Sequence, residues 1–137
     1  MYKLVIHTDA VADLDQIRVH DPASAADILV LIEEFRGDQW VLDRLNEDHF
    51  EFRDQDDWIL NFSVRRWVAQ WNKDRNLWRL KCLTLEDEGY RYRIIYAFLP
   101  LKRTYFVLGV FPRQNFNYDS ADSRTQRVLD AYRSLCE

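Results

Sequence analysis

The sequence predicts an α+β domain: a twisted antiparallel β-sheet with an N-terminal helix pair and a C-terminal helix, all the helices on one side. Between residues 8 and 36, and again after residue 122, apolar residues recur every three or four positions, which is the period of amphipathic helices. Between residues 77 and 111, apolar and polar residues instead alternate or form short β-branched and aromatic runs separated by turn residues, as in antiparallel strands. Helices that flank a set of strands, rather than alternate with them, favour the α+β class.

The chain begins with a predicted strand and a predicted helix. Residues 2–7 (YKLVIH) form a short β-rich run. Thr8 or Asp9 can cap a following helix that extends to about Arg18, because both side chains can accept a hydrogen bond from the first turn. This helix has one apolar face, formed by Ala10, Val11, Leu14 and Ile17.

A second helix is predicted directly after the first. Pro22 suits the first turn of a helix, and Asp21 or Ser24 can cap it. Its apolar face consists of Ala25, Ile28, Leu29, Ile32 and Phe35. Gly37 marks a stop or a bend, and residues 40–45 predict another turn or two of helix. The two helices are expected to pack as an antiparallel pair.

The next segment, residues 46–76, gives a weaker signal. Residues 47–57 are acidic with aromatic interruptions and are predicted to form a loop with one short extended piece. Residues 58–71 fit period two but also fit a helical period, and their Trp, Val and Phe content favours a strand. Residues 72–76 (NKDRN) would then turn this strand back as a hairpin.

Three further strands are predicted from Leu77 onward. Residues 77–83 alternate, which places Arg79 and Lys81 together on one face. Residues 86–89 (EDEG) predict a turn. Residues 90–99 form a second strand, with Arg91, Arg93, Ile95 and Ala97 on one face and Tyr92, Ile94, Tyr96 and Phe98 on the other.

The last strand and the closing helix complete the prediction. Residues 100–103 turn the chain, and residues 104–111 form a largely apolar strand. Asp122 or Ser123 can cap the closing helix. Its apolar face consists of Val128, Leu129, Tyr132 and Leu135.

The composition is that of one globular domain, so residues 1–137 are predicted to form a single unit. Cys82 and Cys136 lack a CxxC spacing and predict neither a disulfide scaffold nor a zinc site, and we expect no metal and no other cofactor. No apolar run approaches the roughly 20 residues of a membrane span, and no secretory leader is recognisable. We therefore expect a cytoplasmic protein that does not contact a membrane. The oligomeric state is left open.

The net charge of −4 is unevenly distributed. Residues 1–74 carry a net charge of −8, residues 75–118 carry +5, and residues 119–137 carry −1. A basic segment within an acidic chain predicts a local surface for anions. The alternative is a solvated sheet face whose charges bind nothing in particular.

The basic residues of this segment indicate a phosphate-binding surface. Arg79, Lys81 and Arg93 lie on predicted neighbouring strands, and Arg113 follows the last strand. Arginine holds phosphate through two parallel hydrogen bonds, and lysine acts as a point charge. Such a surface could stabilise the phosphorane that forms when an RNA 2′-hydroxyl attacks the adjacent phosphorus, a reaction that needs no metal.

That reaction also needs a proton acceptor. His7, His20 and His49 are scattered, and we expect no catalytic role for them. Tyr118 remains as the candidate, provided that nearby cations lower its pKa from about 10. The alternative is that Tyr118 is an aromatic residue that anchors the last loop.

The same segment resembles the RelE branch of the RelE/ParE superfamily of bacterial toxins. The resemblance rests on the elements WRLK (78–81), YRIIY (92–96), VLGV (107–110), Arg113 and NYD (117–119), in that order. The first strand, the helix pair and the closing helix fit the family plan as well. Residues 46–76 look like an insertion.

The resemblance implies roles for individual residues. Arg79 and Lys81 match a basic pair that grips RNA phosphates, and Arg93 matches the arginine that stabilises the transition state. Arg113 matches the arginine implicated as the acid for the leaving group, and Tyr118 matches the tyrosine implicated as the base.

The implied function is that of the toxin of a type II toxin–antitoxin system. It would be an endoribonuclease that cuts mRNA in the ribosomal A site and is silenced by a cognate antitoxin. The alternative is a non-catalytic binding module on the same fold, such as a ParE-like DNA gyrase inhibitor or an inactive toxin relative.

Overall fold

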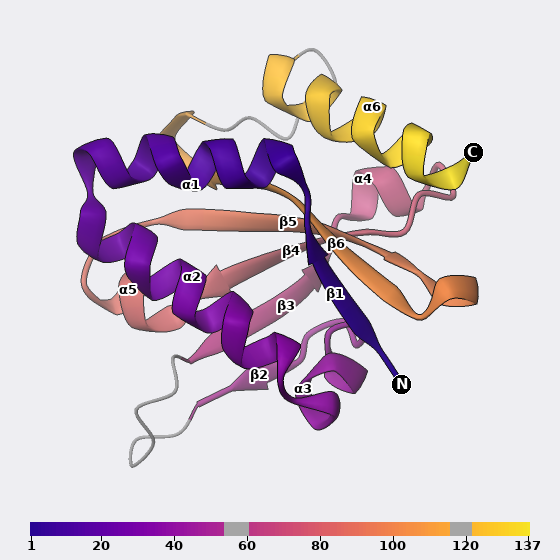
Figure 1. Cartoon of the computed structure of the whole chain (residues 1–137), viewed down its shortest axis with the longest axis horizontal. Helices are drawn as coiled ribbons and strands as arrows, with labels where there is room; N and C mark the ends of the chain where they lie inside the picture. Colours follow the sequence, from indigo (N-terminus) through magenta and orange to yellow (C-terminus); the bar gives the residue numbers. More distant parts are fainter. Residues whose placement is uncertain (54–60, 116–121) are drawn as a thin grey trace.

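The computed structural model describes residues 1–53, 61–115 and 122–137, and it has the predicted α+β architecture (Figure 1). An N-terminal helix pair, a six-stranded and mostly antiparallel sheet and a C-terminal helix follow the predicted order, an arrangement consistent with a RelE-like fold. None of the helices within the described residues is both long and apolar enough to cross a membrane.

The sheet has the strand order β1-β6-β5-β4-β3-β2. Its strands are β1 (Lys3–Ile6), β2 (Glu51–Phe52), β3 (Phe62–Arg66), β4 (Leu77–Cys82), β5 (Tyr92–Leu99) and β6 (Thr104–Pro112). All neighbouring strands are antiparallel except β1 and β6, which are parallel. The predicted antiparallel sheet therefore includes one parallel pair, at the β1 edge.

The helices α1 (Thr8–His20) and α2 (Pro22–Arg36) lie side by side over one face of the sheet (Figure 1). The N-cap of α1 is His7, whose Nδ1 accepts a hydrogen bond from the Asp9 N–H at 3.0 Å, and not Thr8 or Asp9 as predicted. Asp21 caps α2 as predicted. Gly37 ends α2, and α3 (Gln39–Arg44) follows.

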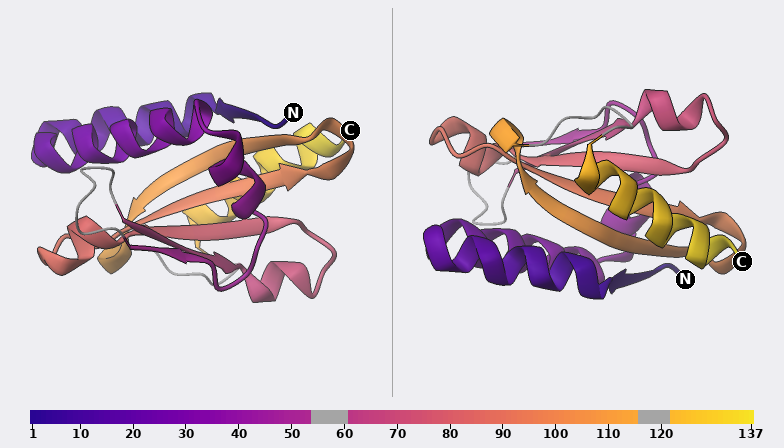
Figure 2. Two further views of the ribbon diagram at one scale, coloured as in Figure 1. Left: turned by 90° about the horizontal axis from the view of Figure 1, so that it is seen from below. Right: turned by 90° about the horizontal axis from the view of Figure 1, so that it is seen from above.

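The C-terminal helix α6 (Ser123–Cys136) packs on the opposite face of the sheet. Neighbouring residues of β5 separate the two layers, because Ile94 packs with the α1 and α2 side chains while Ile95 packs with those of α6. Figure 2 shows α6 apart from the α1–α2 layer. The prediction that all helices lie on one side is therefore wrong. Because both faces of β5 carry apolar side chains, helices pack on both faces of the sheet and shield them from water.

The segment predicted as one strand over residues 58–71 contains two elements. Within its described part, β3 ends at Arg66 and the short helix α4 (Val68–Trp71) follows. A strand would point residues 67 and 71 to the same face. Instead, Trp67 is buried on the α6 side, and Trp71 packs edge-on against Trp78 on the other side.

Two short elements connect the central strands. A helix, α5 (Leu83–Asp87), occupies the place where a turn was predicted, because Leu83 and Leu85 are both buried and anchor it. The turn itself follows at Gly89, whose φ of 89° lies in the left-handed region that favours glycine. The 3₁₀ turn η1 (Pro100–Lys102) joins β5 to β6, and η2 (Arg113–Asn115) follows β6.

Candidate functional site

A basic hollow lies on the face of the sheet that also carries α6. It has a volume of about 280 Å³ and is lined by Arg65, Arg79, Lys81, Arg93 and Arg113. The structure thus brings together the four basic residues predicted from the sequence, and it adds Arg65. Because the strands are ~4.8 Å apart, the fold holds these cations close together, and their like charges repel one another.

The register of the strands explains this gathering. Arg65 of β3 pairs directly with Arg79 of β4. Two residues further along β4, Lys81 pairs with Ser63 of β3. Arg79 pairs in turn with Ile95 of β5. Alternate residues of a strand share a face, so all these side chains point to the same side of the sheet.

Arg93 is the most deeply buried cation of the basic hollow, with an exposed fraction of 6%. Its Nη1 donates hydrogen bonds to the Glu86 carboxylate and, at 2.9 Å, to the Tyr92 carbonyl. Glu86 lies on α5, which begins directly after β4 and carries the carboxylate back to β5. The ion pair fixes the guanidinium and removes part of the positive charge of the site.

Lys81 has an altered acidity. Burial lowers the pKa of its ammonium group from the ordinary value of 10.5, and the charge of Arg93 lowers it further. Arg79 and Arg65 act in the same direction, whereas Glu86 opposes them. Among the residues that the structure describes, Lys81 has no ion pair. An anion in the basic hollow would therefore be a favourable neighbour for Lys81.

Arg65 was not among the site residues predicted from the sequence. The alternation of β3 places Ser63 and Arg65 on one face, and that signal is present in the sequence FSVRR. The missing information was the register of β3 against β4, which depends on a connection through α4 that the sequence did not predict. In the structure Arg65 is exposed and its Nη1 contacts the Nδ1 atom of His49.

The remaining predicted site residue, Tyr118, lies outside the described residues. Its role as a proton acceptor stays a prediction. The three histidines lie apart, as expected: His7 caps α1, His20 ends α1, and His49 is beside Arg65. Within residues 1–53, 61–115 and 122–137, no three His, Cys, Asp or Glu side chains are grouped so that they could hold a metal ion.

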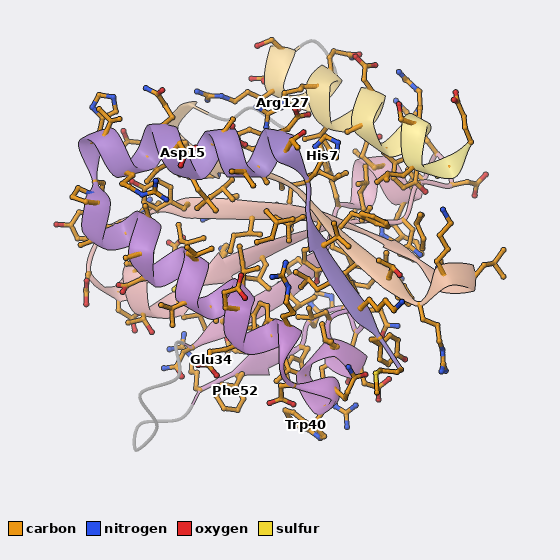
Figure 3. All side chains as sticks on the ribbon, viewed as in Figure 1. His7, Asp15, Glu34, Trp40, Phe52 and Arg127 are labelled. Carbon is orange, nitrogen blue, oxygen red and sulfur yellow. The ribbon has the colours of Figure 1, made fainter. Side chains whose placement is uncertain are left out.

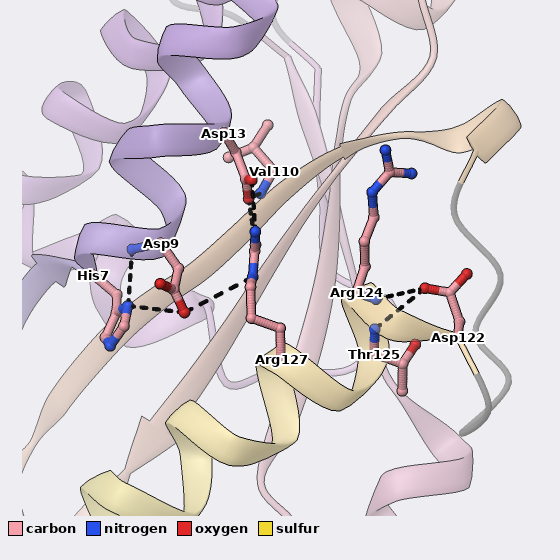
Figure 4. Close-up of polar contacts among 8 residues, drawn as sticks. All are labelled: His7, Asp9, Asp13, Val110, Asp122, Arg124, Thr125 and Arg127. Atoms are coloured by element: carbon pink, nitrogen blue, oxygen red, sulfur yellow. Dashed lines mark hydrogen bonds and ion pairs between the residues drawn. The ribbon is translucent and has the colours of Figure 1, made fainter.

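A salt-bridge network ties α6 to α1 and β6 (Figure 4). Both terminal nitrogens of Arg127 donate to the Asp13 carboxylate of α1, at 2.9 and 2.6 Å, and Asp13 also accepts the Val110 N–H of β6 at 2.9 Å. Asp9 lies 3.8 Å from Arg127 Nε and 3.6 Å from the ring of His7. These contacts raise the pKa of Arg127 and tie α6 to α1 and β6.

A second hollow, of about 190 Å³, lies on the opposite side of the sheet between α2, α3 and β2. Figure 3 shows Glu34, Trp40 and Phe52 close together at this corner. Its lining is largely apolar and includes Phe35, Val41 and Phe62, together with Asp38. Among the described residues its lining contains no basic side chain, so its chemistry differs from that of the basic hollow.

Comparison of the chain with known proteins gave no match: no family model, no curated protein and no solved structure aligns with it. Functional conclusions therefore depend on the residues and the geometry described above.

Proposed function

We propose that the chain is the toxin of a type II toxin–antitoxin system and acts as a ribosome-dependent mRNA endoribonuclease. The observation that supports this most is the basic hollow, in which the fold gathers four residues chosen from the sequence alone: Arg79, Lys81, Arg93 and Arg113. The RelE-like order of strands and helices agrees with the same proposal.

In this mechanism the basic residues hold the scissile phosphate while the adjacent 2′-hydroxyl attacks the phosphorus. Arg79 and Lys81 bind phosphate oxygens, and Arg93 stabilises the charge of the phosphorane. Fixed cations need no reorganisation during the reaction, which is why a preorganised site stabilises a transition state better than water does. The protons are transferred by Tyr118, as acceptor, and by Arg113, as donor to the leaving oxygen.

One observation favours the alternative, a non-catalytic binding module. Arg93 is already paired with Glu86, so its charge is partly compensated before any phosphate arrives. In a module that only binds, this pair would be a structural link between α5 and β5. In the enzyme, the pair orients the guanidinium, and the phosphate binds donors that are used by neither Glu86 nor the Tyr92 carbonyl, because a guanidinium has five.

The partners follow from the same proposal. The substrate is mRNA in the A site of a ribosome, and a cognate antitoxin would silence the toxin by covering the basic hollow. Both partners would be met in the cytoplasm.

Primer extension on a reporter mRNA in a translating extract tests the proposal. The wild-type protein should produce in-frame cuts that depend on ribosomes. Lys81→Gln and Arg79→Gln should abolish most of the cutting, because each removes a cation from the basic hollow. Arg66→Gln is the matched control, since Arg66 is exposed but points to the other face of β3.

The outcome separates the two candidates. An intact message with folded wild-type protein would overturn the endoribonuclease proposal and favour the binding module, whose first test is inhibition of DNA supercoiling by gyrase. Cuts that persist in Arg79→Gln and Lys81→Gln would show that the basic hollow is not the site of cleavage.

A further inference from the structure

The basic residues of the sheet are arranged in pairs that step diagonally across the strands. In the first row, Arg65 of β3 lies opposite Arg79 of β4. In the next row, Lys81 of β4 and Arg93 of β5 follow the last registered pair of these strands, Leu80 and Ile94, and both line the basic hollow. Each pair thus bridges two neighbouring strands on the same face.

A third pair continues the diagonal. Arg113 follows β6, and its N–H donates to the Arg91 carbonyl at 2.9 Å, so the two residues extend the β5–β6 ladder by one row. Arg91 directly precedes β5 and is exposed, and continuing the alternation of β5 by one residue puts it on the face of Arg93. We call these six residues the basic track: Arg65, Arg79, Lys81, Arg93, Arg91 and Arg113.

The spacing of the pairs follows from strand geometry. Successive pairs are displaced by one strand, ~4.8 Å, and by two residues along the strands, ~6.8 Å. The diagonal step is therefore about 8 Å. The long, flexible arginine and lysine side chains can bring consecutive phosphates of one strand to consecutive pairs.

We propose that the basic track binds one single strand of RNA diagonally across the sheet, with one phosphate at each pair, and that Arg65 and Arg91 hold its two ends. This proposal depends on the proposed function, which supplies the substrate class. It adds the path of the strand and two binding residues that the resemblance does not assign.

The lining of the basic hollow favours a nucleic acid over an acidic protein. The centre of a protein–protein interface is depleted in charge and enriched in aromatic side chains. Among the described residues, those that line the basic hollow are all arginine or lysine. Contact with phosphates should therefore dominate, and binding should be insensitive to base sequence and strongly dependent on salt.

The test is the salt dependence of binding to fluorescein-labelled oligouridylates whose 2′-hydroxyls are methylated, measured by fluorescence anisotropy without ribosomes. Methylation prevents cleavage. For a single strand, the slope of log K against log salt is about −0.7 for each phosphate contact. Arg65→Gln and Arg91→Gln should each reduce the slope by about 0.7. Arg66→Gln, on the opposite face of β3, should leave it unchanged.

The length of the oligonucleotide gives a second readout. For the wild-type protein, affinity should rise with oligonucleotide length until three phosphates are present and then stay constant. For Arg65→Gln or Arg91→Gln, affinity should stop rising at two phosphates. The proposal is overturned if both variants bind like Arg66→Gln. It is also overturned if a polyglutamate peptide of matched charge binds better than the oligouridylate.

These outcomes can be told apart from failure of the proposed function. If the slopes change as expected but no mRNA is cut, the track binds RNA and the enzymatic proposal fails. If mRNA is cut but the terminal variants bind and cut like wild type, the enzymatic proposal holds and the path assigned to the strand is wrong.

Discussion

Glu86 and Arg93, seven residues apart in the chain, form an ion pair whose two side chains have exposed fractions of only 17% and 7%. The pair connects α5 to β5 at the base of the basic hollow. It therefore contributes both to the stability of the fold and to the charge of the site, and the two contributions can be measured separately.

Glu86→Ala should strongly destabilise the protein, because it leaves the buried Arg93 guanidinium without its carboxylate. Removing one partner of a buried pair costs about 3–5 kcal/mol in the free energy of unfolding. Urea denaturation measures this. Glu88→Ala changes an exposed carboxylate of the same connection and should stay within about 0.5 kcal/mol of wild type. Equal effects of the two substitutions would show that the pair does not stabilise the fold.

Lys81 should make stability depend on alkaline pH. The pKa of Lys81 is lowered in the folded state from its ordinary value of 10.5. Between the lowered value and 10.5, the unfolded chain therefore binds more protons than the folded chain. The free energy of unfolding should increase as pH rises through this range. Comparison of wild type with Lys81→Met by urea denaturation at several pH values should show this gain only in wild type. Lys73→Met serves as the control, because Lys73 is exposed in a turn.

Tyr92 should have the opposite effect. Burial, followed by its hydrogen bond to Asp21, raises the pKa of Tyr92 to about 12. The stabilisation is present below pH 10 and is lost as pH rises from about 10 towards about 12, because the unfolded chain loses the phenolic proton first. Tyr92→Phe should lose about 1.5–3 kcal/mol near neutral pH, the usual contribution of a hydrogen bond to a charged group. A wild-type advantage that persists unchanged at pH 12 would contradict this assignment.

The link between Arg127 and Asp13 should hold α6 in place. Arg127→Met should weaken the attachment of the helix, and a double-mutant cycle with Asp13→Asn should give a coupling energy of about 0.5–3 kcal/mol. Amide hydrogen exchange should then show faster exchange in α6 while the central strands stay protected. A coupling energy near zero would mean that apolar packing alone holds α6.

Patterns within single elements predicted most of the fold. Alternation in β4 and β5 correctly placed Arg79, Lys81 and Arg93 on one face, and the capping residue Asp21 and the stop at Gly37 correctly bounded α2. These signals are local, because the period of a strand or the chemistry of a cap is written in neighbouring residues.

Some errors lie within single elements, such as the helix α4 where a strand was predicted, and the others concern relations between elements. Both faces of β5 are apolar, so the sequence did not indicate that α6 would lie opposite α1 and α2. The position of Arg65 beside Arg79 depends on the β3–β4 register. The ion pair between Arg93 and Glu86 depends on how α5 packs against β5. Each is set by packing between segments, which a pattern within one segment does not contain.

The parallel pairing of β1 with β6 has a consequence for the order of folding. Lys3 pairs with Thr104, so the first strand finds its partner only after about 100 further residues have been synthesised. At roughly 5–20 residues per second, the nascent chain spends several seconds with β1 unpaired. Closure of so long a loop is entropically costly and makes folding slow. The basic hollow, which also needs Arg113, can form only when most of the chain has left the ribosome that made it.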